Sequence, residues 1–173
     1  MNNMQREKDP LRQWQGKVSK AKGKAFENML DATFMYYKNK GFAIIEKTPE
    51  PMRPVRPLGG GRFEAFFEKK AQPDYKGIIK GGRTVMFEAK FTSSDRMEQS
   101  RVSPGQTEYM ERHSELGAKC YVIAGFESGN TYLIPWNVWR EMKEYFGRKY
   151  IKETDLDDYK LKTAWNGILQ ILN

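Results

Sequence analysis

The stretch PDYKGIIKGGRTVMFEAK, residues 73–90, contains the clearest local structure in the sequence. Gly81 and Gly82 give a strong turn signal, because consecutive glycines readily adopt the backbone angles of tight hairpin turns. Extended, apolar segments lie on both sides of these glycines. The sequence therefore predicts a β-hairpin over Gly77–Lys90.

The chain before and after this hairpin also has recognisable patterns. Apolar residues with the spacing of an amphipathic helix occupy Lys24–Lys40. Phe42–Ile45 has the composition of a buried strand. Ser103 followed by Pro104 predicts the start of a second helix, which would continue to Gly117.

The C-terminal part is expected to alternate strands and helices. Strands are predicted over Lys119–Phe126 and Thr131–Ile134, and a helix over Pro135–Gly147, whose two tryptophans are expected in the core. A short packing helix is proposed around Trp165–Leu172. This order predicts an α/β fold, a single domain with a mixed β-sheet flanked by helices.

The composition limits the class of protein. The chain has 173 residues and a net charge of +8, which favours a polyanionic partner. Residues 1–24 hold seven basic and two acidic side chains, so they form either a solvated tail or a binding arm. The single Cys120 excludes an internal disulfide and argues against a structural zinc finger.

Membrane association is not expected from the sequence. No run of 18 or more apolar residues is present, and the chain begins with polar and charged residues. These features predict a protein without a membrane span or signal peptide, located in the cytoplasm.

The segment TPEPMRPVRPLGGGR, residues 48–62, is rich in proline and glycine. Proline withholds ladder hydrogen bonds and favours extended geometry. We expect either an exposed loop or an extended arm that protrudes from the body.

Three residues of the hairpin form the chemically significant cluster. Alternate side chains of a strand share a face, so Glu88 and Lys90 project together, and the hairpin carries Asp74 close to Glu88. A Mg²⁺ ion would remove the repulsion between the two carboxylates and bind water and a phosphate oxygen. Lys90 could orient the attacking water. The pattern indicates phosphodiester hydrolysis; the alternative is an exposed ion pair.

These motifs resemble a known family. Pro73-Asp74 followed by Glu88-Ala89-Lys90 is similar to the PD-(D/E)xK signature of restriction-endonuclease-like nucleases. Gly23–Glu27, Asp74–Gly77 and Phe87–Lys90, with the proline-rich excursion, resemble the RecU-type Holliday junction resolvases of Gram-positive bacteria and their phages. The resemblance covers roughly residues 20–147.

The resemblance implies a restriction-endonuclease-like core and a homodimeric, Mg²⁺-dependent endonuclease that cuts four-way DNA junctions, with Mn²⁺ able to substitute and a recombinase as a partner. It implies that Glu27 joins Asp74 and Glu88 around the metal and that Lys90 is the catalytic lysine. The alternative for Glu27 is a favourable interaction with the helix dipole.

The resemblance also suggests a DNA-binding surface. The proline-rich arm would be a stalk, inserted at about residues 49–70 into a nuclease domain of residues 23–173, with residues 1–22 as a basic arm. Gln106 lies where related nucleases place polar residues beside the active site. The alternative is that Gln106 has no role in the site and is exposed on its helix. The residues expected to contact DNA are Lys20, Lys22, Lys24, Arg53, Arg56, Arg62 and Gln106.

Two alternative functions remain open at the level of sequence. One is a nuclease of the same fold that cuts other DNA structures. The other is a DNA-binding recombination accessory protein without catalysis, in which the acidic cluster is structural. The accessory protein would bind DNA regardless of Mg²⁺ and would not cleave it.

Overall fold

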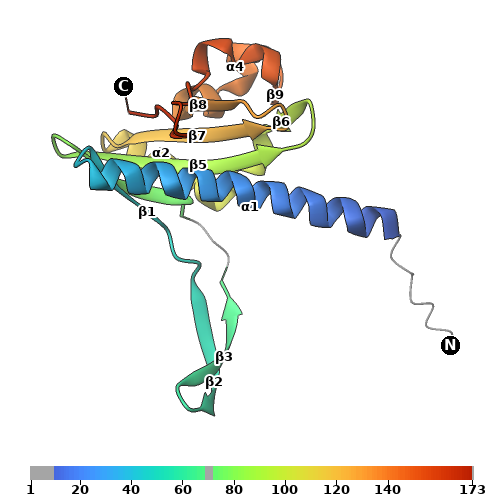
Figure 1. The fold of residues 1–173 in the computed structure, drawn as a ribbon, viewed down its shortest axis with the longest axis vertical. Coiled ribbons are helices and arrows are strands. Elements are labelled where there is room, and N and C mark those ends of the chain that lie inside the picture. Colours follow the sequence, from blue (N-terminus) through green and yellow to red (C-terminus); the bar gives the residue numbers. More distant parts are fainter. Residues whose placement is uncertain (1–9, 69–71, 173) are drawn as a thin grey trace.

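The computed structural model describes residues 10–68 and 72–172. Its central sheet has five strands: β1 (Ala43–Lys47), β4 (Tyr75–Ile79), β5 (Arg83–Thr92), β7 (Lys119–Phe126) and β8 (Thr131–Pro135). They are arranged in the order β1-β4-β5-β7-β8 (Figure 1). β5 and β7 are parallel and the other neighbouring pairs antiparallel, so the predicted mixed sheet is confirmed.

The predicted hairpin is present as β4 and β5. Its register pairs Tyr75 with Phe87, which places the residue before β4 beside the second half of β5. Gly81 and Gly82 occupy the turn with φ of +96° and +88°, a region that glycine enters without a steric penalty. The local turn chemistry therefore fixes which residues of the two strands lie opposite each other.

Helix α1 (Pro10–Asn39) covers one face of the sheet. Phe26, Leu30 and Phe34 pack there against apolar residues of β1, β4, β5 and β7. The helix begins fourteen residues before the predicted start at Lys24, and its N-terminal part extends past the sheet (Figure 1). The expected boundary between a basic arm and the nuclease domain at residue 22 thus falls inside a continuous helix.

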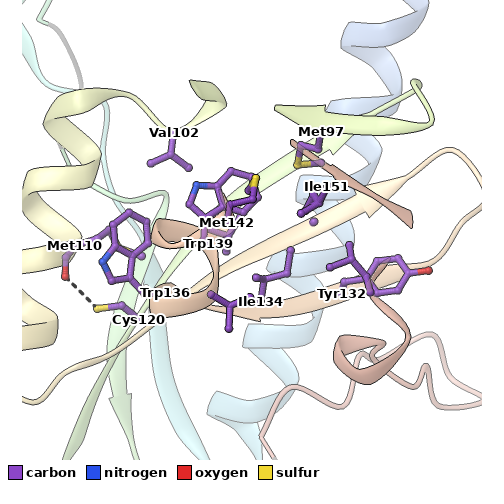
Figure 2. Packing of buried hydrophobic residues seen from close by; sticks show 14 of the residues in the cluster. Met97, Val102, Met110, Cys120, Tyr132, Ile134, Trp136, Trp139, Met142 and Ile151 are labelled. Carbon is purple, nitrogen blue, oxygen red and sulfur yellow. Dashed lines mark hydrogen bonds between the residues drawn. The ribbon is translucent and has the colours of Figure 1, made fainter. Parts of the chain in front are cut away.

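The opposite face is covered by α2 (Pro104–Glu115), α3 (Trp136–Arg140) and α4 (Met142–Phe146). Figure 2 shows Trp136 and Trp139 inside this layer, as predicted, and Cys120 directed at the Met110 carbonyl. The single helix predicted over Pro135–Gly147 is instead two short helices. Among the described residues, no helix has the length and apolar character needed to span a membrane.

Short elements complete this layer. A two-stranded sheet joins β6 (Arg96–Glu98) to β9 (Tyr150–Lys152). The described residues also include three 3₁₀ turns, η1 (Gln99–Arg101), η2 (Glu153–Asp155) and η3 (Asp157–Tyr159).

The prediction of a packing helix around Trp165–Leu172 is wrong. This segment is extended and turns at Gly167, whose φ is +81°. It is fastened to α1 because Tyr37 Oη donates to the Leu169 carbonyl at 2.6 Å and accepts from Ile171 N at 2.8 Å. The apolar residues near the C-terminus therefore join the α1 side of the core without helical structure.

The proline-rich segment is an extended arm that projects from the body (Figure 1). Its strands β2 (Met52–Gly59) and β3 (Arg62–Phe67) pair antiparallel with each other in a separate two-stranded sheet. The pairing is irregular after Pro54 and Pro57, as expected where proline cannot donate to the ladder. The arm alternative is therefore confirmed over the loop alternative.

Candidate active site

Glu88 and Lys90 lie in the second half of β5, on the sheet face that carries α2. Phe87 of the same strand packs against α1, so the strand's alternation places Glu88 on the other side. The Glu88 side chain has no solvent exposure, and Lys90 Nζ lies 2.5 Å from its Oε1. Glu88 is buried and Lys90 is largely covered, so the expected alternative of an exposed ion pair does not apply.

Gln106 meets the same carboxylate from α2. Its Nε2 donates to Glu88 Oε1 at 2.7 Å, while its Oε1 accepts from the Ser103 backbone N–H at 3.0 Å. Ser103 Oγ accepts from the Gln106 backbone N–H in return, which completes a capping box. Gln106 is therefore buried and oriented by the start of the helix. The sequence alternative that left it exposed is wrong.

Asp74 lies beside Glu88, as the hairpin predicts. Its backbone N–H is 3.2 Å from Glu88 Oε2, and its Oδ2 accepts from the Ala89 backbone N–H at 3.0 Å. Burial first, and then the charge of Asp74, raise the pKa of Glu88 to about 7, although Lys90 partly opposes this. The site thus confines two neighbouring carboxylates with one ammonium group.

Glu27 lies on α1 and is held by lysines. Its Oε2 is 2.6 Å from Lys47 Nζ and 3.7 Å from Lys24 Nζ. Although burial lowers the pKa of Lys47, the hydrogen bond to Glu27 and the charges of Asp31 and Asp74 raise it. Within the described part of the chain, no three Asp, Glu, His or Cys side chains are gathered to hold a metal ion. The structure therefore does not join Glu27, Asp74 and Glu88 in one such group.

Sequence reasoning missed three residues next to Glu27. They are Lys47, Tyr75 and Asp31. The Tyr75 Oη donates a hydrogen bond to Asp31 Oδ1 at 2.6 Å. Burial and this hydrogen bond raise the pKa of Tyr75. Asp31 follows Glu27 by one helical turn, a spacing that could have indicated a shared face. Lys47 and Tyr75 carry no comparable local signal, because strand pairing brings them there.

The lysines of α1 predicted to bind DNA differ in their surroundings. Lys20 and Lys24 are exposed, although Lys24 is near Glu27. Lys22 pairs with Glu127, just after β7. Lys20 and Lys24 therefore present their charge to solvent more freely than Lys22 does.

The arginines predicted to bind DNA from the arm are all exposed. Arg53 is on β2, and Arg62 begins β3. Arg56 lies 3.2 Å from Glu64 across the two strands. The arm also exposes three aromatic side chains, Phe63, Phe66 and Phe67.

The donor set at the centre of the site fits a divalent cation in its chemistry. Asp74 and Glu88 offer carboxylate oxygens, and their mutual repulsion would be relieved by a cation. Mg²⁺ is usually held by one or two carboxylates with waters and substrate phosphates completing its shell. Two adjacent carboxylates are thus sufficient for such a site.

A mixed sheet flanked by helices, with Asp74 before one strand and Glu88 and Lys90 on the next, is the α/β arrangement that the sequence predicts. A family model described as RecU, Recombination protein U, matches residues 21–173. The chain belongs to the RecU family.

Several curated relatives are similar to this chain. "Holliday junction resolvase RecU" of Streptococcus pneumoniae (strain Hungary19A-6) is 35% identical over 121 residues, which are 66% of this chain and 61% of that protein. The proteins of the same name from Streptococcus sanguinis and Streptococcus gordonii are 34% and 33% identical over 121 residues, 66% of this chain and 60% of each. The chain spans about three fifths of the length of these relatives.

One solved structure has a weaker likeness. Hjc of Archaeoglobus fulgidus, titled a Holliday junction resolvase from an archaeal hyperthermophile, superposes with a TM-score of 0.47 at 16% identity. The match covers 84% of this chain and 95% of that chain.

Proposed function

We propose that this protein is a metal-dependent endonuclease that resolves four-way DNA junctions by phosphodiester hydrolysis. The observation that carries the proposal is the buried Glu88 carboxylate, which Lys90 and Gln106 both contact and beside which Asp74 lies. Burying such a cluster without a ligand costs free energy, and perturbed carboxylates of this kind are typical of functional sites. The relatives' names support junctions as the substrate.

Each residue of the cluster has a proposed role. Asp74 and Glu88 hold the divalent cation. When bound, the cation makes its water more acidic and polarises the scissile phosphate. Lys90 orients the attacking water and offsets the negative charge that develops on phosphorus. Gln106 fixes the orientation of the Glu88 carboxylate through its own anchored side chain.

The identity of the metal and the role of Glu27 are finer proposals. We expect Mg²⁺, with Mn²⁺ able to substitute, because hard oxygen donors suit both ions. Glu27 is proposed as a further ligand, which requires its carboxylate to leave the ion pair with Lys47.

The DNA-binding surface is proposed to include the exposed lysines of α1 and the arginines of the arm. Such contacts hold the phosphate backbone without reading its sequence. A homodimer suits a junction because two copies of the site would meet two strands of a nearly two-fold symmetric substrate. A recombinase partner remains a proposal that rests on the family alone.

The test is cleavage of a labelled four-way junction and of a linear duplex of the same sequence, in Mg²⁺ or in EDTA. Wild type is compared with Asp74→Asn and with Asp158→Asn, an exposed carboxylate on η3 that serves as a matched control. We expect paired, metal-dependent cuts in the junction, lost in Asp74→Asn although DNA binding persists, and retained in Asp158→Asn.

Other outcomes would change the proposal in defined ways. Equal cleavage of junction and duplex would retain the nuclease and remove the junction as its substrate. Metal-independent binding of DNA without cleavage would contradict the enzyme and favour the accessory protein.

A further inference from the structure

A cleft opens beside the candidate active site, between α1 and the C-terminal end of β5. Its volume is about 510 Å³, and Lys90 lies in its lining. Ser19 and Gly23 line it on the α1 side, and Ser93, Ser94 and Arg101 line it on the side of β5 and η1. A phosphate that reached Lys90 from this side would therefore lie in or next to the cleft.

The two walls of the cleft are tied together at one end. Glu127 accepts hydrogen bonds from Lys22 of α1 and from Ser93 of the loop after β5, and these bonds lower the pKa of the Glu127 carboxyl. This connection links the loop to the helix at the protein surface. Lys22, predicted from sequence to contact DNA, is already engaged here with a carboxylate.

The lining is suited to an anion. Glu27 also borders the cleft, but Lys47 and Lys24 lie close enough to offset its charge. Arg101 is exposed, and within residues 10–68 and 72–172 no hydrogen bond or ion pair engages its side chain. An unpaired guanidinium in this lining complements phosphate oxygens, which arginine binds with two parallel hydrogen bonds.

The backbone that carries Arg101 is anchored on both sides. Gln99, two residues earlier, donates from its Nε2 to the carbonyls of Trp139 and Arg140 at 2.8 and 2.7 Å. On the other side, Val102 is buried, and Ser103 begins the capping box of α2. Arg101 therefore stands on an anchored turn, so that binding a ligand requires little ordering of the backbone that carries it.

We propose that this cleft receives the sugar–phosphate backbone of the DNA strand next to the scissile phosphate, and that Arg101 binds one phosphate of that strand. The inference rests on the proposed function and extends it by one substrate-contacting residue and its surface. The contact is to the backbone and is independent of base sequence.

The experiment measures the salt dependence of junction binding by the full chain in EDTA, where cleavage is not expected. Arg101→Gln is compared with Arg112→Gln, which removes an exposed arginine that pairs with Glu108 on α2. Loss of one phosphate contact should reduce the slope of log Kd against log salt concentration by about 0.9. Arg101→Lys should keep the slope, and Arg112→Gln should match wild type.

Kinetics give a second readout. In single-turnover cleavage with Mg²⁺, Arg101→Gln should raise the protein concentration that gives half-maximal rate by several fold. The rate at saturation should stay near that of wild type, because Arg101 is proposed to bind the strand and does not contact the cluster around Glu88. An unchanged salt slope and half-saturation in Arg101→Gln would overturn the proposal.

A variant on the opposite wall keeps the proposal falsifiable if Arg101→Gln fails to fold. Ser19→Glu places a negative charge in the cleft from α1, and Ala32→Glu places the same charge at an exposed position further along that helix. Ser19→Glu should weaken junction binding and Ala32→Glu should not; equal binding by both would contradict the proposal. If wild type itself neither binds nor cuts junctions, the proposed function fails. If wild type cuts them while Arg101→Gln and Ser19→Glu match it, this inference alone fails.

Discussion

Gln106 of α2 donates a hydrogen bond from Nε2 to Oε1 of Glu88 on β5, across 2.7 Å. The same side chain accepts from the backbone of Ser103 and so belongs to the cap of its own helix. The start of α2 and the buried carboxylate are thus mechanically coupled. Displacing the helix start would also displace the group that we propose to hold the metal.

Gln106→Ala is expected to lower junction cleavage by about 10- to 100-fold, the usual cost of losing a group that orients a metal ligand. Junction binding in EDTA should change little. Ser103→Ala is the matched control, because it removes a cap acceptor and leaves the contact to Glu88. It should cost about 1 kcal/mol of stability with a smaller loss of cleavage. Equal cleavage by both variants would show that capping alone explains the effect.

The metal-free stability of the protein should depend on Glu88 ionisation. Its pKa is raised from 4.5 to about 7 in the folded chain, so between these values the folded state binds more protons than the unfolded state. Unfolding free energy therefore falls as pH rises through this window, by about 3 kcal/mol in order of magnitude. The stabilising effect is complete below pH 4.5 and absent above pH 7.

Glu88→Gln has no charge to bury and should not lose this stability. Urea unfolding in EDTA at pH 5 and pH 8 measures the difference between variant and wild type at each pH. We expect the variant to gain about 2 kcal/mol relative to wild type on going to pH 8. A difference that does not change with pH would contradict the raised pKa.

The parts of the structure that sequence predicted well are those specified locally. The hairpin follows from Gly81 and Gly82, and the proximity of Asp74 to Glu88 follows from its register. The start of α2 follows from Ser103 and Pro104. In each case residues close in sequence determine the geometry.

The parts that sequence did not predict depend on distant partners. Lys47 reaches Glu27 because β1 pairs with β4 beneath α1, and no local pattern records that pairing. The first turns of α1 lack an amphipathic pattern since they extend past the sheet. The segment ending at Leu172 is apolar because it packs on α1. Its apolar spacing alone resembles that of a helix, which is why the sequence predicted one there.

The β2–β3 arm should be separable from the stability of the body. Its large apolar side chains are exposed, and the Glu68 backbone N–H donates to the Pro51 carbonyl at 2.9 Å where the arm leaves the body. Replacing residues 52–67 with a short Gly-Ser turn should shift the melting temperature by no more than about 2 °C. Junction binding should weaken while the cluster around Glu88 stays intact. Full retention of junction cleavage and preference would contradict a role for the arm.

Gly77 should be intolerant of any side chain. It lies in β4 where a Cβ atom would be 2.0 Å from the Ile44 carbonyl oxygen and 2.6 Å from the Ile45 Cα, and these backbone atoms cannot move without breaking the pairing of β1 with β4. Gly77→Ala should therefore cost at least about 3 kcal/mol of stability. It should also impair cleavage, because the same pairing continues into the hydrogen bond from Thr48 N–H to the Asp74 carbonyl.

Gly16→Ala is the matched control for this change. Gly16 is in α1, where a Cβ atom would meet no other atom within 4 Å, so alanine should stabilise the helix by about 0.5–1 kcal/mol. Urea unfolding of both variants against wild type measures the contrast. A Gly77→Ala protein as stable as wild type would mean that β1 and β4 do not approach as closely as the structure shows. In that case the pairing of β1 with β4 would not position Asp74, which would be held by its contact with β5 alone. Gly77→Ala should then show neither a loss of stability nor a loss of cleavage.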